Sequence, residues 1–442
     1  MKKLLFFIFL NLLYSQPIDF SLYKLESKNL TNKPVLLIMS GIQGDEPGAF
    51  NATSILIKYY KIIDGNVWVV PNLNQYSILK NNRGIYGDMN RKFANLDSSD
   101  PDYKIIQNIK KLILDENVGS ILHLHDGSGF YRDKYISNLL NQNRWGNCSI
   151  IDQNSLLEYN DLNNNISNIV NHINENLLNE IHRFHVRNTN TANGDSEQLK
   201  SLTYFATLNK KLAYASEASK SLPLGERVYY HLLAIEGMLK LMNIEFKRDF
   251  TLDIKSINNL INDKNTNIVI NDIIELPLYN IKPHLNYFPI PKENLKFYSN
   301  TPIVWLFKDD KNFRIKNGNK NLVSLKPLFI EFDDSLKNIT LDIDNSEIEV
   351  PIGTIIKAKN SFKITNLPYR VNVIGFQQSG LNSEVDVEIK RSDLLNKFAI
   401  DKNNTKFRVE FYKQEKNKKD EFAGMIIIDF SETNKDDTQK LH

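Results

Sequence analysis

Apolar and polar residues follow two different patterns along this chain, and the change of pattern divides it. Up to about residue 246, short apolar runs alternate with stretches in which apolar residues recur every three or four positions. The short runs predict buried strands, and the longer stretches predict helices. Strands separated by helices indicate a three-layer α/β domain around a largely parallel sheet. The expected strands are 35–39, 66–70, 119–125 and 212–216, and the expected helices are 49–62, 103–114, 155–181 and 224–241.

The pattern from residue 247 onward is that of an all-β region. Short alternating runs predict strands, and turn residues such as those at 317–319 and 379–380 separate them. Such spacing is typical of small sandwiches or barrels. A break near 333–338 predicts one domain at 247–336 and another at 337–442. The expected strands are 303–308, 328–332, 338–343, 369–376, 384–390, 406–413 and 422–430.

The first fifteen residues have the composition of a secretory signal peptide. Lys2 and Lys3 precede an apolar stretch at 4–13, which is too short to span a bilayer as a helix. A buried N-terminal strand or helix is the alternative. Cleavage is expected near Ser15, which leaves an α/β domain at 16–246 and a mature chain without a transmembrane segment.

Charge and cysteine content exclude several classes of function. The formal net charge is only +3, and no basic patch is interleaved with aromatic residues, so no nucleic-acid partner is expected. Cys148 is the only cysteine. The chain therefore cannot form an internal disulfide or a thiolate zinc site, and a metal must be held by histidine, carboxylate or amide oxygen.

A glycine-rich turn follows the first predicted strand of the α/β domain. It places Gln43 and Glu46 three residues apart, so that both side chains can be aimed at one point. Carboxylate is a common zinc ligand, whereas a neutral amide oxygen is a weaker donor than imidazole. Taken alone, the pair is equally compatible with a solvated turn.

The second candidate cluster lies at the end of the strand predicted at 119–125. His123 and His125 are two residues apart, so their side chains point to the same face of the strand. His125, at the strand end, is the expected metal ligand, and His123 is expected to support it.

Two further clusters complete the candidate site. Arg83, Asn90 and Arg91 lie in a polar loop, and guanidinium groups bind carboxylates with paired hydrogen bonds. Glu217 ends a strand of small residues, a position that suits a general base acting on water beside a metal. Each cluster alone is a weak signal.

The order of these clusters resembles the zinc metallocarboxypeptidase family over about residues 30–245. The family pattern is His-x-x-Glu, Pro-x-x-Asn, Asn-Arg-x-Phe, a strand-end His and a late Glu. The corresponding residues here are Gln43 and Glu46, Pro71 and Asn74, Asn90, Arg91 and Phe93, His125, and Glu217. The resemblance implies a zinc ion held by Gln43, Glu46 and His125, Glu217 as the catalytic base, and substrate carboxylate bound by Arg83, Asn90 and Arg91. The candidates for the family's substrate-capping tyrosine position are Thr203, Tyr204 and Tyr214.

Glutamine at the first ligand position, a signal peptide and a β-rich second half are together similar to a narrower group. These are periplasmic D,L-carboxypeptidases that trim cell-wall muropeptides and set cell shape in helical Gram-negative bacteria. The resemblance implies a barrel-like domain followed by an immunoglobulin-like sandwich. It also implies release of meso-diaminopimelate (mDAP) from L-Ala-γ-D-Glu-mDAP stems, leaving a dipeptide. Muropeptides are the expected partners, with the β domains docking to peptidoglycan or to other wall enzymes.

Two other functions are compatible with the same residues. A zinc deacylase of the desuccinylase or aspartoacylase type shares the strand-end histidine and the late glutamate. A non-catalytic peptidoglycan-binding protein would have Gln43 as the mark of a decayed metal site. The signal peptide and the long β region disfavour the deacylase, and retention of Glu46, His125, Arg91 and Glu217 together disfavours decay.

Overall fold

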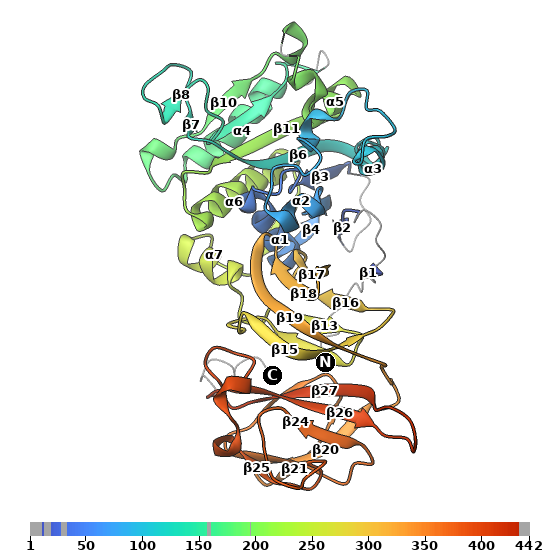
Figure 1. Cartoon of the computed structure of the whole chain (residues 1–442). Coiled ribbons are helices and arrows are strands. Elements are labelled where there is room, and N and C mark those ends of the chain that lie inside the picture. The colour runs from blue at the N-terminus through green and yellow to red at the C-terminus, as the bar shows by residue number, and fades with distance from the viewer. Residues whose placement is uncertain (1–10, 13–18, 28–32, 157–160, 195, 433–442) are drawn as a thin grey trace. The chain divides into compact units, whose positions relative to one another are not determined.

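The structure is a computed structural model of the whole chain, and it describes residues 11–12, 19–27, 33–156, 161–194 and 196–432. Two compact units are present (Figure 1). The first comprises residues 16–262, and the second comprises 263–442 together with 1–15. Each unit is described separately below.

A seven-stranded mixed sheet forms the centre of the first unit. All neighbouring strands are parallel except two pairs, β9 with β11 and β2 with β5. The largely parallel sheet predicted from the sequence is therefore confirmed. In spatial order the strands are β10 (His185–Asn188), β9 (Cys148–Ile151), β11 (Leu212–Ser219), β6 (Val118–Gly127), β3 (Val35–Met39), β5 (Asn66–Val70) and β2 (Tyr23–Glu26).

Helices cover both faces of this sheet. On one face Leu36, Leu122 and Tyr214 pack in a core with α1 (Pro47–Tyr59), α4 (Leu162–Asn174) and α6 (Leu224–Leu241). On the other face Leu37 and Ile121 pack with α3 (Tyr103–Ile113) and α5 (Leu202–Leu208). Because side chains alternate along a strand, His123, His125 and Glu217 belong to the α3 and α5 face.

The first unit extends further along the chain than the sequence predicted. Strand β12 (Glu245–Arg248) pairs with β4 (Tyr60–Asp64), and α7 (Ile254–Ile261) packs against α6. These contacts carry the unit to Asn262, whereas the predicted boundary fell at residue 246. The sequence showed only the change in the pattern of apolar and polar residues. It did not show that β12 pairs with a strand some 180 positions earlier.

The predicted helix at 155–181 is largely replaced by shorter elements. Helix α4 begins after Asp161, whose side chain accepts a hydrogen bond from Asn164 N, and it ends at Asn174. Strands β9 and β10, on either side of α4, were not predicted, because a four-residue apolar run and a polar edge strand lack a clear alternation. Residues 157–160 of the predicted helix lie outside the described residues.

Short elements connect the sheet to the loops around its carboxyl end. They are α2 (Gln75–Lys80), η1 (Met89–Arg91), β7 (Phe130–Tyr131), β8 (Leu140–Asn141), η2 (Glu180–His182), η3 (Thr191–Asn193) and η4 (Gln198–Lys200).

The second unit is built of strands, as predicted. Its first part has two four-stranded sheets, made of β1 (Asn11–Leu12), β16 (Lys296–Ser299), β13 (Asn267–Ile270) and β14 (Ile274–Pro277), and of β15 (His284–Pro291), β19 (Lys320–Ile330), β18 (Asn312–Asn317) and β17 (Val304–Asp309). Its second part also has two, made of β21 (Ser346–Pro351), β20 (Asn338–Ile343), β23 (Ser361–Ile364) and β25 (Ile389–Lys390), and of β22 (Ile355–Lys357), β27 (Glu421–Asp429), β26 (Lys406–Lys413) and β24 (Arg370–Val373), with the short helices η5 (Arg391–Asp393) and η6 (Asn396–Phe398) between strands.

The predicted signal peptide lies almost entirely outside the described residues. Only Asn11–Leu12 are described, and they pair antiparallel with β16. Among the helices that the structure describes, none combines the length and the apolar composition needed to cross a membrane.

Candidate metal centre and active site

The turn that carries Gln43 and Glu46 is held against α2 by close backbone packing. Strand β3 ends at Met39, and Ser40 N donates to Val70 O on the neighbouring strand. A Cβ atom at Gly44 would lie 2.1 Å from the backbone of Ser77, so only glycine fits at position 44. The turn then runs directly into α1, with Glu46 as the N-cap residue.

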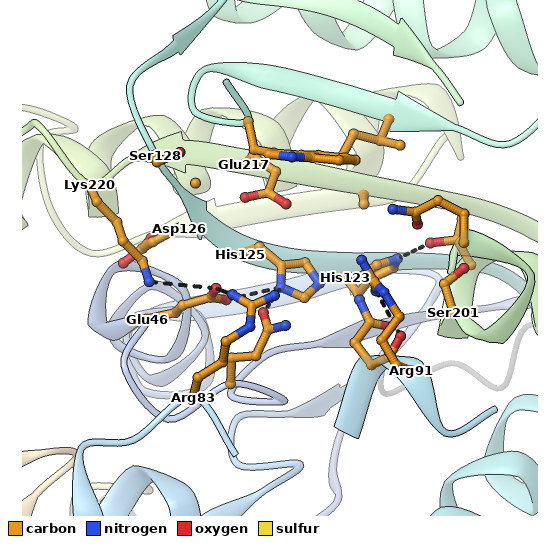
Figure 2. A pocket seen from close by; sticks show the side chains of 18 of the residues that line it. Glu46, Arg83, Arg91, His123, His125, Asp126, Ser128, Ser201, Glu217 and Lys220 are labelled. Carbon is orange, nitrogen blue, oxygen red and sulfur yellow. Dashed lines mark hydrogen bonds and ion pairs between the residues drawn. The ribbon is translucent and has the colours of Figure 1, made fainter. Parts of the chain in front are cut away.

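Three donor atoms, two from the turn between β3 and α1 and one from β6, meet in one pocket. Figure 2 shows Glu46 and His125 side by side there. His125 Nδ1 lies 2.9 Å from Gln43 Oε1 and 2.9 Å from Glu46 Oε2. The nitrogen carries at most one proton, so it cannot donate fully to both oxygens. A tetrahedral ion with bonds of about 2.0–2.1 Å separates its ligands by about 3.3 Å. Both nitrogen–oxygen distances are thus within about half an ångström of the spacing that ligands of a shared ion require.

The charges around these atoms also suit a cation. Burial raises the pKa of Glu46 well above its usual range, and Asp126 adds to the effect, so the ionised carboxylate needs a compensating charge. Burial lowers the pKa of His125, which favours the neutral imidazole that binds metals. Among the described residues, no group of three His, Cys, Asp or Glu side chains could hold a metal ion. The amide oxygen of Gln43 is the further donor within hydrogen-bond distance of His125 Nδ1.

Asp88 determines which end of the Gln43 amide faces the site. Gln43 Nε2 donates to Asp88 Oδ1 at 2.8 Å, and this contact turns Oε1 toward His125. Arg83 holds the same carboxylate, with its Nη2 2.8 Å from Asp88 Oδ2. Burial alone would raise the pKa of Asp88, but Arg83 and the Gln43 hydrogen bond lower it on balance, so Asp88 stays ionised. Asp88 thus positions the side-chain amide of Gln43.

Replacing Asp88 by asparagine is expected to weaken metal binding by about 10- to 100-fold, as loss of a partner behind a metal ligand typically does. The asparagine can present its NH2 group to Gln43, and the glutamine amide can then turn its own NH2 group toward the metal. Titration against a competing chelator measures the affinity. Asp97→Asn, at an exposed position that does not line the pocket, is the matched control. Equal affinities in the two variants would show that Asp88 does not orient Gln43.

A chain of hydrogen bonds fixes the other side of the His125 ring. His125 Nε2 lies 2.8 Å from His123 Nδ1, and His123 Nε2 lies 2.6 Å from Thr203 Oγ1. If Nδ1 carries no proton, as metal binding would require, His125 donates to His123, which in turn donates to Thr203. Burial and the neighbouring His125 lower the pKa of His123 well below its usual value, so this relay is neutral. The supporting role predicted for His123 is consistent with this geometry.

Asp126 ties the strand that bears His125 to two helices. Its Oδ2 accepts from Gly48 N in α1 and from Arg227 in α6, and its Oδ1 lies 2.9 Å from His231 Nε2. Burial would raise the pKa of Asp126, but the contacts with His231 and Arg227 lower it overall. The β6 strand end and the α1 N-terminus are therefore held in a fixed relation, and with them His125 and Glu46.

Glu217 lies beside the three donor atoms. Strand β11 runs parallel to β6 with Glu217 opposite His125, and Figure 2 shows the Glu217 carboxylate next to the imidazole. Enclosure in the pocket raises the pKa of Glu217 to about 7, against the lowering effect of His125. A carboxyl group poised near neutral pH suits proton transfer.

The three predicted substrate residues line the same pocket but differ in how free they are. Arg91 Nη1 donates to Asn90 O at 2.9 Å, and Arg91 forms no ion pair with any residue that the structure describes. Asn90 Oδ1 accepts from Leu202 N, which leaves the amide nitrogen as the donor toward a ligand. Arg83 is half-exposed and already paired with Asp88, and it lies 3.9 Å from Glu46. Arg91 is therefore the better placed guanidinium for a substrate carboxylate.

Comparison with known protein families assigns the chain along almost its whole length. Residues 2–262 match the catalytic domain of carboxypeptidases controlling helical cell shape, the M99 peptidases. Residues 263–331 match the β-barrel domain of M99 carboxypeptidase, and 332–431 match a C-terminal domain of metallo-carboxypeptidase. The chain belongs to the M99 family.

Solved structures of a cell shape determinant protein resemble this chain closely. Crystal structures of apo and tripeptide-bound Csd4 from Helicobacter pylori are each 44% identical, with a TM-score of 0.88, covering 93% of this chain and 100% of that one. The mDAP-bound form of Csd4, described as a D,L-carboxypeptidase, is 45% identical, with a TM-score of 0.88, covering 92% and 100% of the two chains. No curated protein sequence matches the chain.

Membership of the M99 family confirms several predictions. The chain is a metal-dependent carboxypeptidase with a mixed α/β catalytic domain, a barrel-like domain and an all-β C-terminal domain. The family match favours this activity over both alternatives, the deacylase and the non-catalytic binding protein.

The M99 pocket also contains residues that the sequence did not point to. Gln198 lies in the short helix η4, and the others lie in loops or next to the ends of helices and strands. They are Ser128, Trp145, Asp152, Gln198, Ser201 and Lys220. Lys220 Nζ lies 2.7 Å from Asp45 and 3.9 Å from Glu46. Lys220 follows β11, and the predicted strand stopped at residue 216, so extending that strand to Ser219 would have found it.

Of the three candidates for the capping position, only Thr203 lines the pocket. Tyr214 is buried on the opposite face of β11, where its hydroxyl accepts a hydrogen bond from Asn165 in α4. Tyr204 lies in α5, outside the set of residues that line the pocket.

Proposed function

We propose that this M99 carboxypeptidase is a zinc-dependent D,L-carboxypeptidase that releases mDAP from peptidoglycan tripeptide stems and leaves a dipeptide. The convergence of Gln43, Glu46 and His125 next to Glu217 carries the proposal. The similarity to Csd4, whose structures include mDAP-bound and tripeptide-bound forms, supports this choice of substrate.

Zinc suits the donor set, which offers one carboxylate, one imidazole and one amide oxygen. Gln43 Oε1, Glu46 Oε2 and His125 Nδ1 would hold it. When bound, zinc supplies a Lewis acid that polarises the scissile carbonyl and makes water more acidic.

Glu217 is the proton carrier in this proposal. Its carboxylate takes a proton from the attacking water and gives it to the leaving amine of mDAP. The bond between the γ-carbonyl carbon of D-Glu and the mDAP nitrogen breaks, and the products are a dipeptide carboxylate and free mDAP. The raised pKa of Glu217 suits both halves of this transfer.

Arg91 and Asn90 are proposed to hold the carboxylate of the released residue. A guanidinium and an amide on the same short helix, η1, can bind both oxygens of one carboxylate. mDAP carries a second carboxylate on its distal centre, and Arg83, half-exposed at the pocket, is the candidate for it.

The proposed place of action is the periplasm, reached through the predicted signal peptide. The substrate is a component of the cell wall, which lies outside the cytoplasmic membrane. The β domains remain candidates for docking to peptidoglycan or to other wall enzymes.

Incubation with defined muropeptides, followed by mass analysis, tests the proposal. Zinc-loaded protein should shorten a tripeptide stem by one mDAP residue, and a chelator should stop the reaction until zinc is restored. Failure of zinc-loaded, folded protein to cleave the tripeptide would reject the proposed function.

Exchange of Gln43 for histidine is expected to retain or increase zinc affinity and activity. Imidazole is a stronger donor than an amide oxygen and is equally neutral, so the charge of the site is unchanged. The ring also offers an N–H group for Asp88. Chelator competition and kcat/KM on the tripeptide measure both effects, with Gln43→Ala as the variant that lacks a third ligand. A marked loss of zinc in Gln43→His would contradict a shared ligand position.

A further inference from the structure

Asp152 is an unexplained acid in the wall of the pocket. It follows β9 directly and lines the cavity, with only 3% of its surface exposed. Its Oδ1 accepts the hydroxyls of Thr189, at 3.0 Å, and of Thr191. Its Oδ2 is buried and has no hydrogen-bond donor among the residues that the structure describes. A buried carboxylate oxygen without a donor is unfavourable, so the position calls for a partner that arrives with a ligand.

Strand pairing places Asp152 on the same face of the sheet as Glu217. Ile150 lies opposite Ala215, and Cys148 lies opposite Glu217, in the antiparallel pair of β9 and β11. Asp152 is two residues beyond Ile150, so its side chain points to the same side. Cys148 is level with Glu217, and Asp152 is four residues further along the chain. At the usual rise of a strand, this places the Asp152 backbone about 13 Å along the strand from the level of Glu217.

The spacing matches the length of the substrate. In a tripeptide stem the amine on the distal centre of mDAP is about 9 Å from the scissile carbonyl carbon when the side chain is extended. A hydrogen bond adds about 3 Å. A stem whose scissile bond lies at Glu217 can therefore bring this amine to Asp152.

The charges in the pocket point to the same pairing. Arg83, Arg91 and Lys220 are its cationic side chains, and they suit the carboxylates of the substrate. Glu46 and Glu217 have assigned roles, and Asp126 is already bound by Arg227 and His231. Asp152 is the remaining acid of the pocket, whereas the distal centre of mDAP carries an ammonium group.

We infer that Asp152 is a specificity residue that binds the free ammonium group on the distal centre of mDAP through Oδ2. The inference rests on the proposed function. It implies that the enzyme acts on stems whose distal amine is free. A stem that is cross-linked through this amine carries an uncharged amide there, and binding it would leave Oδ2 without its cation.

The test compares two tripeptides that differ only at the distal amine. One contains mDAP, and the other contains 2-aminopimelate, which keeps the carbon chain and the distal carboxylate but lacks the amine. The wild-type protein should prefer the mDAP stem by about 10- to 100-fold in kcat/KM, the range expected for a buried hydrogen bond to a charged group. Asp152→Asn should lose most of this preference, mainly through a higher KM for the mDAP stem, and should cleave the 2-aminopimelate stem as the wild type does.

Asparagine keeps an oxygen for Thr189 and Thr191, so the fold is expected to persist. Calorimetric binding of free mDAP, compared with 2-aminopimelate, gives a readout that does not depend on turnover, and it should show the same loss of preference in Asp152→Asn. A stem acetylated on the distal amine, which imitates a cross-link, should be a poor substrate for the wild type.

Three outcomes separate the possibilities. Equal losses on both stems in Asp152→Asn would assign Asp152 a structural role and overturn the inference. A wild-type enzyme that cleaves both stems equally well would also overturn it, while leaving the proposed function intact. A wild-type enzyme that cleaves neither stem would reject the proposed function itself.

Discussion

Replacement of Glu217 by alanine is expected to lower kcat on the tripeptide by about 10³-fold or more, near the upper end of the usual contribution of a general base. The reason is positional. Glu217 stands opposite His125 on the neighbouring parallel strand, and it lines the pocket. The other acids of the pocket already have a role in the proposed site or a partner within the protein. Zinc content and mDAP affinity should be close to those of the wild type, because the proposed site assigns Glu217 neither a bond to the metal nor a contact with the substrate carboxylates.

Zinc analysis and calorimetric mDAP binding on the same preparation separate loss of chemistry from loss of the site. Glu217→Gln should behave like the alanine variant, because an amide has the shape of the carboxyl group but cannot accept the proton. Glu180→Ala, whose exposed side chain pairs with Arg183, is the matched control. Substantial hydrolysis by Glu217→Ala with its zinc intact would remove Glu217 from the role of base.

The second large effect is expected at Glu46 and His125, the two stronger donors of the proposed metal site. Glu46→Ala and His125→Ala should each lower zinc affinity by more than the 10- to 100-fold that is usual for loss of a supporting residue. Each substitution leaves only two protein donors at the proposed site, and one of them is the amide oxygen of Gln43, a weak donor. Activity should fall in parallel and should recover only in part at high zinc concentration.

Chelator competition and metal analysis after dialysis measure this loss. The exposed His284 in β15 supplies a matched control, because His284→Ala removes a histidine outside the pocket. Stoichiometric zinc in either ligand variant would contradict the assignment of the three donors. It would also require a different ligand set within the pocket.

Several parts of this site followed from the sequence. The turn at residues 40–46 comes after an unbroken apolar run, and its three-residue spacing allowed Gln43 and Glu46 to share a target. Strand alternation placed His123 and His125 on one face, and the structure has them in a direct hydrogen bond. Local pattern was sufficient in these places because each pair lies within one element or one turn.

Asp88 and Asp152 could not be assigned in this way. Asp88 lies in the polar loop that carries Arg83, Asn90 and Arg91, but its place in that loop does not show which side chain it binds. Asp152 follows a strand that the sequence did not predict. The role of Asp88 depends on its contact with Gln43, which lies 45 positions earlier and donates a hydrogen bond to it. The role of Asp152 depends on the antiparallel pairing of β9 with β11, which places the Asp152 side chain in the wall of the pocket.

By itself, the sequence determined the strongly periodic strands and helices of the first unit and the faces that they bury, because strand and helix periods depend on residues only a few positions apart. It therefore gave the strand that ends before Gln43, the strand that ends at His125 and the strand that carries Glu217. Only the tertiary structure decided that these strand ends meet, since β3, β6 and β11 are neighbours in the sheet although long stretches of chain separate them. The order of strands in a sheet depends on burial and pairing across the whole domain, and local pattern does not encode it.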